Sequence, residues 1–321
     1  MKKRRHMIPL AVLVGVLLFA IGVCLWTLYK PNTERKSYQV SVILTDSGSG
    51  MWTNMLNGMR AAASEMDVTL NVVETTVGMT LEEEKSLVEQ ELEDGADGII
   101  LDLWEEDAGY GYLSDLSEKT DVVLIHASEE DKDLKWGSVS EQDYEMGRAI
   151  GEKIKKVNSM TVHVGIMAGD QSLGYMQERL EGLESVLDEY LDDRPVWIME
   201  KDETSLEALT SRNGVSRADV IIALDNASLE TAAAYYASNG NPSLEIIGIG
   251  TSRTNIYAMD QGQILTMVVP HGFEAGYMAV KDVMRQLVEN EGCEVFENGF
   301  TAVDASDMYT NENQSLLFPV G

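Results

Sequence analysis

The chain has 321 residues, and its 24 lysines and arginines against 54 aspartates and glutamates give a formal net charge of −30. This acidic excess repels polyanions and leaves no basic stripe in the body of the protein, so no nucleic-acid partner is expected. The two cysteines are Cys24, in an apolar N-terminal run, and Cys293; no intramolecular disulfide is expected, and the fold must depend on its hydrophobic core.

The N-terminal segment has the pattern of a membrane anchor. Residues 8–29 are uncharged and strongly apolar, and at about 1.5 Å rise per residue such a helix crosses a hydrocarbon core of roughly 30 Å. Four basic residues occupy positions 2–5, so the positive-inside rule predicts residues 1–7 as a cytoplasmic tail and residues 30–37 as an external linker. The chain is therefore expected in the cell membrane as a single-pass protein with an extracellular C-terminal domain.

A cleaved signal peptide is the main alternative to this anchor. The apolar run is longer than the usual hydrophobic region of a signal peptide, and no small-residue cleavage site precedes Lys30, so retention is favoured. Lipidation of Cys24 is disfavoured, because Val23 stands where a bacterial lipobox has a small residue.

The first part of the exported body predicts a βαβ unit. Val40–Leu44 form a β-branched run, apolar residues then recur with helical spacing from Trp52 to Met66, and Thr69–Val73 has the pattern of a second strand. The polar turn Thr45–Gly50 follows the first strand, and open α/β sheets bind ligands at the carboxyl ends of their strands. We therefore expect this turn to contact a ligand.

Apolar runs and helical patterns alternate along most of the remaining chain. Further strands are predicted at Gly98–Leu101, Val122–Ile125, Val162–Met167, Val196–Met199, Val220–Leu224, Ile246–Ile249 and Ile264–Val268. The clearest further helices are predicted at Met146–Val157, Leu173–Tyr190 and Phe273–Leu287. This alternation predicts parallel sheets with crossover helices, an α/β architecture. A group of glutamates is expected on solvent-exposed helix faces: Glu82, Glu83, Glu84, Glu89, Glu91 and Glu93.

Two segments repeat one pattern at the same stage of two successive βα series. Ala96–Asp102 reads ADGIILD and Ala218–Asp225 reads ADVIIALD. The repeat implies two similar lobes, each of which presents an aspartate, Asp102 or Asp225, at the carboxyl end of a strand facing a common cleft. Asp225 also suits the N-cap of the next helix, and that role is compatible with ligand contact.

Together these landmarks form an ordered series of motifs: TDSGSGMW, ADGIILD, VSEQDYEMGRAIGEKI, QERLEGLESVL, ADVIIALDNASLETAAA, IIGIGTS and TAVDASDMYTNEN. From residue 38 to about 318 the series resembles the type I periplasmic binding proteins, in the ribose- and galactose-type sugar-binding branch. The resemblance implies two similar doubly wound parallel-sheet lobes joined by a three-crossover hinge. The N-terminal lobe would comprise residues 38–140 and 271–299 and the C-terminal lobe residues 141–270 and 300–321, with Gln142, Asp143 and Pro270 in the hinge.

The resemblance also implies a set of ligand-binding residues. Trp52 stands where the family has an aromatic that stacks on a sugar ring, which requires an exposed indole face. The other candidates are polar and lie near strand ends or on the ligand-facing helix: Ser49, Asp102, His126, Gln177, Asp225 and His271. Arg179 matches the more structural of two family arginines. Two roles are open for Trp104: a second aromatic wall that stacks on the sugar, or an aromatic residue on the lobe surface.

Catalytic alternatives have weak support. A metal site of His126, His271 and Asp102 is disfavoured because no short-range spacing enforces it. Ser49 lacks the G-x-S-x-G context of a nucleophile, and no dinucleotide-binding loop is present. No catalytic residue, metal or cofactor is therefore predicted, and a metal-dependent or hydrolytic enzyme is the least favoured class.

The function that the resemblance implies is capture of a small sugar-like ligand. The protein would be an extracellular, membrane-tethered solute-binding protein that delivers its ligand to the permease of an ABC transporter. The alternative left open is a sensory subunit that docks on a membrane histidine kinase.

Overall fold

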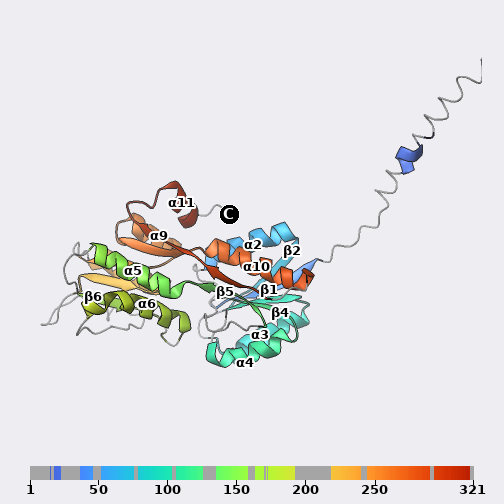
Figure 1. Ribbon diagram of the computed structural model, residues 1–321, viewed down its shortest axis with the longest axis horizontal. Helices are drawn as coiled ribbons and strands as arrows, with labels where there is room; N and C mark the ends of the chain where they lie inside the picture. The colour runs from blue at the N-terminus through green and yellow to red at the C-terminus, as the bar shows by residue number, and fades with distance from the viewer. Residues whose placement is uncertain are drawn as a thin grey trace, which may run out of the picture. The chain divides into compact units, whose positions relative to one another are not determined.

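The computed structural model describes residues 15, 18–22, 37–45, 52–75, 79–102, 106–125, 135–157, 163–169, 171, 173–191, 218–239, 244–289 and 293–318. The chain divides into two units, Met1–Ser37 and Tyr38–Gly321, and the second contains both sheets (Figure 1). None of the described helices combines the length and hydrophobicity that a membrane span requires. Most of the predicted anchor, residues 8–29, and the predicted strand Val196–Met199 lie outside the described residues.

The first sheet has six strands in the described part of the chain, in the order β10-β5-β4-β3-β1-β2, and all neighbouring strands are parallel. Its strands are β1 (Tyr38–Ile43), β2 (Val68–Val73), β3 (Gly98–Asp102), β4 (Asp121–Ile125), β5 (Gly137–Glu141) and β10 (Val295–Asn298). Most are β-branched or apolar, as expected for parallel strands that helices cover on both faces. The central order β2-β1-β3-β4-β5 is that of a doubly wound fold, with ligand sites at the carboxyl ends of the strands.

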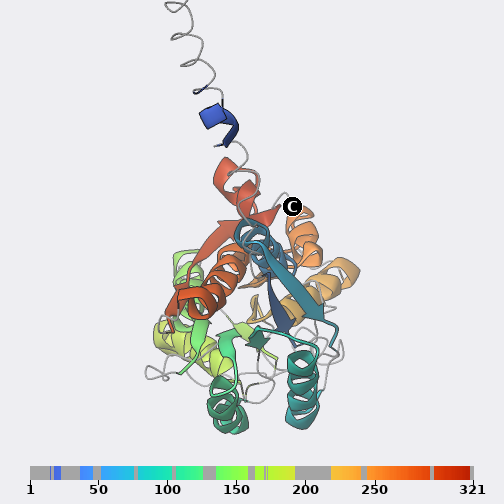
Figure 2. The same ribbon diagram turned by 90° about the vertical axis from the view of Figure 1, so that its right-hand side faces the viewer.

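Helices cover both faces of the first sheet. On one face α2 (Thr53–Met66) and α10 (Gly272–Glu289) pack together, and on the other lie α3 (Leu81–Glu93) and α4 (Glu106–Ser117) (Figures 1 and 2). This six-stranded sheet with its four helices is the first lobe.

The second sheet has the order β11-β9-β8-β7-β6 in the described residues, and only the β11–β9 pair among them is antiparallel. The strands are β6 (Val164–Met167), β7 (Val220–Ala223), β8 (Glu245–Ile249), β9 (Thr266–Pro270) and β11 (Phe300–Asp304). On one face pack α5 (Asp143–Val157) and α6 (Gly174–Leu191), and on the other α8 (Asn226–Asn239), α9 (Arg253–Asp260) and α11 (Asn311–Leu317). This sheet and its helices are the second lobe.

Within the described residues the chain passes between the two lobes at three places. Gln142 separates β5 of the first lobe from α5 of the second, His271 separates β9 from α10, and Gly299 separates β10 from β11. Asp143 begins α5 and Pro270 ends β9, so the candidate hinge residues lie at the first and second of these passages. The two-lobed α/β architecture predicted from the sequence is confirmed.

A reciprocal pair of glycines allows α2 and α10 to pack closely in the first lobe. A Cβ atom on Gly58 would lie 1.9 Å from the carbonyl oxygen of Phe273, and one on Gly276 would lie 1.9 Å from that of Met55. Real Cβ atoms do not approach backbone atoms this closely, so the contact requires glycine on both helices.

In the second lobe, α5 and α6 pack closely through a similar pair of glycines. A Cβ atom on Gly147 would lie 2.0 Å from the carbonyl oxygen of Arg179, and one on Gly182 would lie 1.9 Å from that of Tyr144. Each lobe thus has one helix pair in glycine-mediated contact, in agreement with the internal repeat in the sequence.

Two glutamates predicted on a solvent-exposed face are buried instead. Glu84 and Glu91 have exposed fractions of 0% and 8%, and with Val88 they share the face of α3 that packs on the sheet. The Glu91 carboxylate accepts hydrogen bonds from the Ser41 hydroxyl and the Asn71 amide, which compensates for its loss of hydration. Glu84, Val88 and Glu91 recur with helical spacing, but the many acidic residues of the segment hide this pattern of buried positions. The prediction of a solvated face was therefore wrong at Glu84 and Glu91.

Strands β5 and β10 were also absent from the strands expected from the sequence. The β5 residues are GSVSE, which lack an apolar run, although every one of them is buried. Their backbone is paired on both sides, by β4 and β10, and this lateral pairing rather than local composition makes the segment a strand.

Candidate functional site

A cavity of about 80 Å³ lies between the two lobes, at the carboxyl ends of the parallel strands. The first lobe contributes the start of α2, the end of β5 and the start of α10: Trp52, Asn54, Met55, Glu141 and Gly272. The second lobe contributes α6, the turns after β7 and β8, and the end of β9: Tyr175, Arg179, Asp225, Asn226, Ile249, Gly250, Thr251 and Pro270. This interlobe cavity is where the doubly wound topology predicts a ligand site.

Trp52 forms part of the cavity wall but is largely a core residue. Its side chain is 2% exposed and belongs to the same apolar cluster as Met55 and Met59. The indole Nε1 donates a hydrogen bond to the carbonyl oxygen of Thr45 at 2.7 Å. The sequence predicts an exposed indole face. The structure buries the ring because Trp52, the residue that precedes α2, packs together with the apolar face of α2 against the sheet.

Asp102 does not line the cavity and instead holds the turn after β1. It is 7% exposed, and its Oδ2 accepts hydrogen bonds from both the backbone N–H and the hydroxyl of Thr45. Since β1 and β3 are neighbours in the sheet, this carboxylate fixes the position of Thr45, two residues beyond the end of β1. Its place in the structure is that of a positioning residue.

Asp225 has the corresponding place in the second lobe and also lines the cavity. Its Oδ2 accepts from the Gly169 backbone N–H at 2.7 Å, and Gly169 follows the neighbouring strand β6. Its Oδ1 accepts from the Ser228 backbone N–H at 2.8 Å, and its Oδ2 from the Ser228 hydroxyl at 2.7 Å. Asp225 therefore caps the start of α8, as the sequence allowed.

Arg179 is the positive charge in the described cavity wall, and protein groups already engage it. Its Nε donates to Asp143 Oδ1 at 2.6 Å, its Nη2 to Glu141 Oε2 at 3.2 Å and its Nη1 to the Leu224 carbonyl at 2.8 Å. Burial alone would lower the pKa of Arg179, but Asp143 and Glu141 raise it above the usual value, so the guanidinium stays charged.

Tyr175 places a neutral phenol against this charge. The Arg179 guanidinium carbon lies 4.8 Å from the centre of the Tyr175 ring, within the range of a cation–π contact. Burial raises the pKa of Tyr175 strongly; Arg179 acts against this, and the carboxylates of Asp102, Asp225 and Asp143 add to it. The phenol therefore remains protonated, in the form that donates a hydrogen bond.

Asn226 organises the turn after β8. Its side-chain oxygen accepts from the backbone N–H groups of Thr251 and Ser252 at 2.8 and 3.0 Å, and its amide donates to the Thr251 hydroxyl at 3.3 Å. Five polar or charged cavity residues were not among the sequence candidates: Asn54, Glu141, Tyr175, Asn226 and Thr251. Their positions in the sequence could have indicated them, because most of them lie at the end of a predicted strand or at the start of the helix that follows it.

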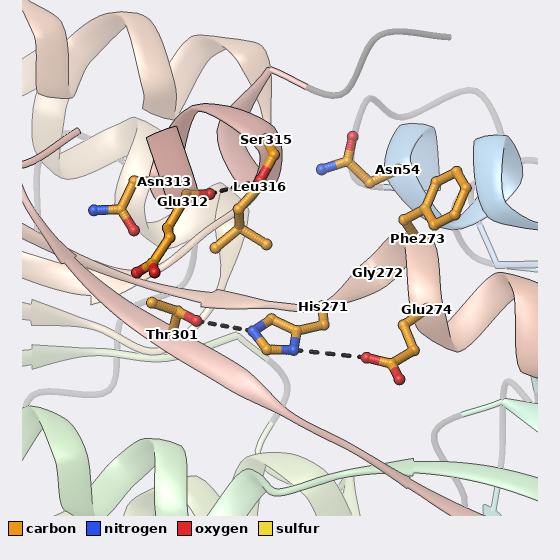
Figure 3. Close-up of a pocket in the computed structure, with 10 residues that line it drawn as sticks. All are labelled: Asn54, His271, Gly272, Phe273, Glu274, Thr301, Glu312, Asn313, Ser315 and Leu316. Carbon is orange, nitrogen blue, oxygen red and sulfur yellow. Dashed lines mark hydrogen bonds and ion pairs between the residues drawn. The ribbon is translucent and has the colours of Figure 1, made fainter. Parts of the chain in front are cut away.

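The remaining candidates are not brought together in the cavity. Gln177 is exposed on α6, where its Nε2 donates to the Gln171 carbonyl at 3.0 Å. His271 lines another pocket, of about 480 Å³, between α10, α11 and β11, which shares Asn54 and Gly272 with the interlobe cavity (Figure 3). Ser49, Trp104 and His126 lie outside the described residues.

The imidazole ring of His271 lies close to side chains of both lobes. Its Nε2 lies 2.8 Å from the hydroxyl oxygen of Thr301 on β11, and its Nδ1 lies 3.9 Å from a carboxylate oxygen of Glu274 on α10 (Figure 3). Across the described ranges no group of three or more His, Cys, Asp or Glu side chains could hold a metal ion.

The chemistry of the cavity favours a neutral polar ligand. Glu141 and Asp225 line it with two carboxylates, although Glu141 is paired with Arg179 and Asp225 accepts hydrogen bonds from Gly169 and Ser228. Three of the five N–H donors of Arg179 are likewise used within the protein. An anionic ligand would meet this acidic wall without a free cation among the described lining residues. A polyhydroxylated molecule could instead donate to the carboxylates and accept from Tyr175 and the amides.

Comparison with known proteins places the chain in a family. A family model described as the periplasmic binding protein domain matches residues 40–291, well over half of the chain. No curated protein matches it significantly. A glucose-galactose binding protein from Geobacillus stearothermophilus, GanP, superposes with a TM-score of 0.73 at 18% sequence identity, over 86% of this chain and 100% of that one.

Two further solved structures share the architecture. An ABC transporter solute-binding protein from Burkholderia graminis, in complex with D-arabinose, has a TM-score of 0.74 at 16% identity, over 85% of this chain and 97% of that one. An ABC transporter solute-binding protein from Agrobacterium vitis, bound with α-D-tagatopyranose, has a TM-score of 0.75 at 11% identity, over 88% of this chain and 100% of that one. At these identities the likeness shows a common fold. Given the extent of the match over residues 40–291, the chain belongs to the periplasmic binding protein domain family, a family of non-enzymatic binding proteins.

Proposed function

We propose that the protein captures a small, neutral, sugar-like molecule in its interlobe cavity outside the cell and delivers it to the permease of an ABC transporter. The observation that carries the proposal is the cavity itself, in which side chains of both lobes converge at the carboxyl ends of the strands. The complexes of similarly folded proteins with D-arabinose and α-D-tagatopyranose support a carbohydrate ligand. The apolar run at residues 8–29 would hold the protein at the membrane.

The ligand would be enclosed by movement of the lobes. The cavity of about 80 Å³ is well below the roughly 300–1,000 Å³ of typical small-molecule sites. A sugar would therefore need the lobes to stand further apart than in this structure, through movement at the hinge residues Gln142, Asp143 and Pro270, and would be held between them. Closure lets donors and acceptors from the two lobes act on one ligand at the same time.

The contacts that we propose follow the positions of the side chains. Trp52 would offer the edge of its buried ring to the apolar side of the sugar, while Tyr175 and Asp225 would bind its hydroxyl groups. Ser49 and His126, which follow β1 and β4 in the sequence, would also contact the sugar. Asp102 would act through the turn it holds, and we do not place Gln177 or His271 in direct contact with the ligand.

Binding can be measured by calorimetry and thermal unfolding with D-glucose, D-galactose, D-xylose, D-arabinose and D-ribose. A ligand at 100 times its dissociation constant should add about 2.7 kcal/mol of stability. Tyr175→Phe should weaken binding about 5- to 10-fold, because it removes one hydrogen bond worth about 1 kcal/mol and keeps the ring beside Arg179. The control Tyr277→Phe removes a hydroxyl that donates to Glu65 on the surface of the first lobe, and it should not change binding.

If no sugar binds, or if a dicarboxylate or phosphate binds in preference to every sugar, the proposal fails. Equal effects of Tyr175→Phe and Tyr277→Phe would place the ligand elsewhere on the protein.

A sensory role is the second candidate, and the predicted linker supports it equally. Residues 30–37 can extend to at most about 28 Å at roughly 3.5 Å per residue, so the binding domain would stay close to the membrane. Such a short tether suits docking onto a membrane histidine kinase as well as onto a permease. Deletion of the gene separates the two roles: loss of sugar uptake supports transport, whereas loss of sugar-dependent transcription with normal uptake supports sensing.

A further inference from the structure

A second cavity, which we call the side pocket, opens directly beside the interlobe cavity. It has a volume of about 450 Å³ and lies between the start of α2 in the first lobe and α9 with the residues flanking α11 in the second. Asn54 and Thr251 line both cavities, so the two spaces are adjacent and share a wall. Because the side pocket also has walls from both lobes, a molecule bound there would bridge them.

Aromatic side chains form one wall of the side pocket. The rings of Tyr309 and Phe318 are nearly parallel, with an interplanar angle of 7° and centroids 6.2 Å apart. They are 57% and 45% exposed, and Tyr257 on α9 is 65% exposed. The hydroxyl of Tyr309 donates a hydrogen bond to the Asp260 carboxylate, which restrains its ring. Flat, restrained and partly hydrated ring faces suit the apolar C–H face of a sugar ring.

Polar side chains surround these rings. The side pocket is also lined by Asn57, Thr251, Arg253 and Asp260, which together supply amide, hydroxyl, guanidinium and carboxylate groups. A carbohydrate combines apolar C–H faces with a rim of hydroxyl groups that both donate and accept. The arrangement of aromatic wall and polar rim therefore matches a sugar ring better than it matches a purely apolar molecule.

We propose that the side pocket is a second carbohydrate subsite, which binds the next ring of a di- or oligosaccharide whose first ring occupies the interlobe cavity. The proposal rests on the proposed function of that cavity and narrows its substrate class from single sugars to short saccharide chains. The volume of about 450 Å³ falls in the range of roughly 300–1,000 Å³ that is usual for small-molecule sites. Chain length should raise affinity, since the additional ring adds contacts to both lobes.

Calorimetry on the full-length protein in detergent micelles tests the subsite. The probes are D-glucose, D-galactose and D-xylose, each with its β-1,4-linked di- and trisaccharide. For the sugar series that binds, we expect the disaccharide to bind at least 10-fold more tightly than the monosaccharide. In the double variant Tyr309→Ala/Phe318→Ala this gain should disappear, while the affinity for the monosaccharide stays within about 2-fold of the wild-type value, a free-energy difference of about 0.4 kcal/mol.

Phe273→Ala is the matched control, because Phe273 is 43% exposed near the lobe boundary but lines the pocket around His271 and not the side pocket. It should keep the full gain with chain length. Two results would overturn the subsite and leave the proposed function intact. One is a monosaccharide that binds with no increase in affinity for the disaccharide. The other is an increase in affinity for the disaccharide that persists in the double variant. If no saccharide of any length binds, the proposed function fails and the subsite fails with it.

Discussion

The Nε atom of Arg179 lies 2.6 Å from Oδ1 of Asp143, the first residue of α5 after the chain enters the second lobe. The same guanidinium reaches Glu141 at the end of β5, which belongs to the first sheet. One buried cation on α6 therefore binds both ends of the first passage between the lobes. This pairing restrains the backbone at Gln142, which lies between the two carboxylates.

Replacing Arg179 by methionine should strongly destabilise the protein. The change keeps much of the side-chain volume but leaves Asp143 and Glu141 buried without their cation, a loss of about 3–5 kcal/mol in the free energy of unfolding. Urea denaturation measures the difference. The control Arg148→Met breaks an exposed pair with Glu145 at 3.6 Å and should change stability by about 1 kcal/mol or less. Equal losses in both variants would contradict the role of Arg179 at the hinge.

Gly182→Ala should destabilise the second lobe although alanine is the better helix former. The new Cβ would meet the carbonyl oxygen of Tyr144, and such overpacking costs about 1–3 kcal/mol. Gly111→Ala, on an exposed position of α4 with no atom near the new Cβ, should instead stabilise the protein by about 0.5–1 kcal/mol. Thermal unfolding compares the two variants. A rise in the melting temperature for both would show that α5 and α6 do not pack this closely.

The Lys153–Asp304 pair should contribute stability that depends on pH. The Nζ of Lys153 on α5 lies 2.5 Å from the Asp304 carboxylate on β11. Partial burial acts to raise the pKa of Asp304, but hydrogen bonds from Lys153 and Thr266 and the charges of Lys153 and Lys156 lower it overall. Because the folded-state value is below the unfolded value of about 3.9, the contribution is complete above that pH and is lost as pH falls through the folded-state pKa.

Asp304→Asn should therefore reduce stability at pH 7 by about 1 kcal/mol or less, since the pair is partly exposed, and the difference from the wild type should shrink once the pH falls below the unfolded-state pKa of about 3.9. Urea denaturation at pH 7, 5, 4 and 3 follows the change. Asp307→Asn is the matched control. The Asp307 side chain is exposed and accepts a hydrogen bond from the Ser306 hydroxyl rather than from a lysine, so this variant should change stability little at any of these pH values. A loss in Asp304→Asn that stays constant down to pH 3 would exclude the ion pair as its cause.

Trp52→Ala should affect both folding and binding. Removal of this buried indole should cost about 3–5 kcal/mol of stability, so the variant should unfold at a lower temperature than the wild type. Trp52→Phe keeps an aromatic ring and loses the hydrogen bond to Thr45, and it should retain sugar binding at reduced stability. Trp136→Ala is the control, since Trp136 is a buried tryptophan in the core on the opposite face of the first sheet.

Calorimetry at a temperature where each variant is folded should show weakened sugar binding in Trp52→Ala and wild-type affinity in Trp136→Ala. Wild-type affinity in both would remove Trp52 from the proposed site.

The α/β architecture of this protein could be predicted from local sequence patterns. The alternation of β-branched runs and helical periodicity located most strands of both lobes, and the repeated ADGIILD and ADVIIALD segments indicated two similar halves. These signals are local, because strand and helix patterns depend on side chains within about ten residues of one another. The same reasoning failed at β5, whose polar residues form a strand through pairing with β4 and β10, and at Glu84 and Glu91, which charge alone would place in water.

Which side chains meet in the cavity depends on how distant segments pack together. Asp102 and Asp225 were correctly placed at strand ends, yet one holds Thr45 and the other holds Gly169 and caps α8. Each of the first two contacts joins residues more than fifty positions apart, and no local pattern records them. Tyr175, Asn226 and Glu141 reach the cavity for the same reason. The directions of their side chains follow from the lateral order of strands and the packing of helices, which the periodicity of a single segment does not contain.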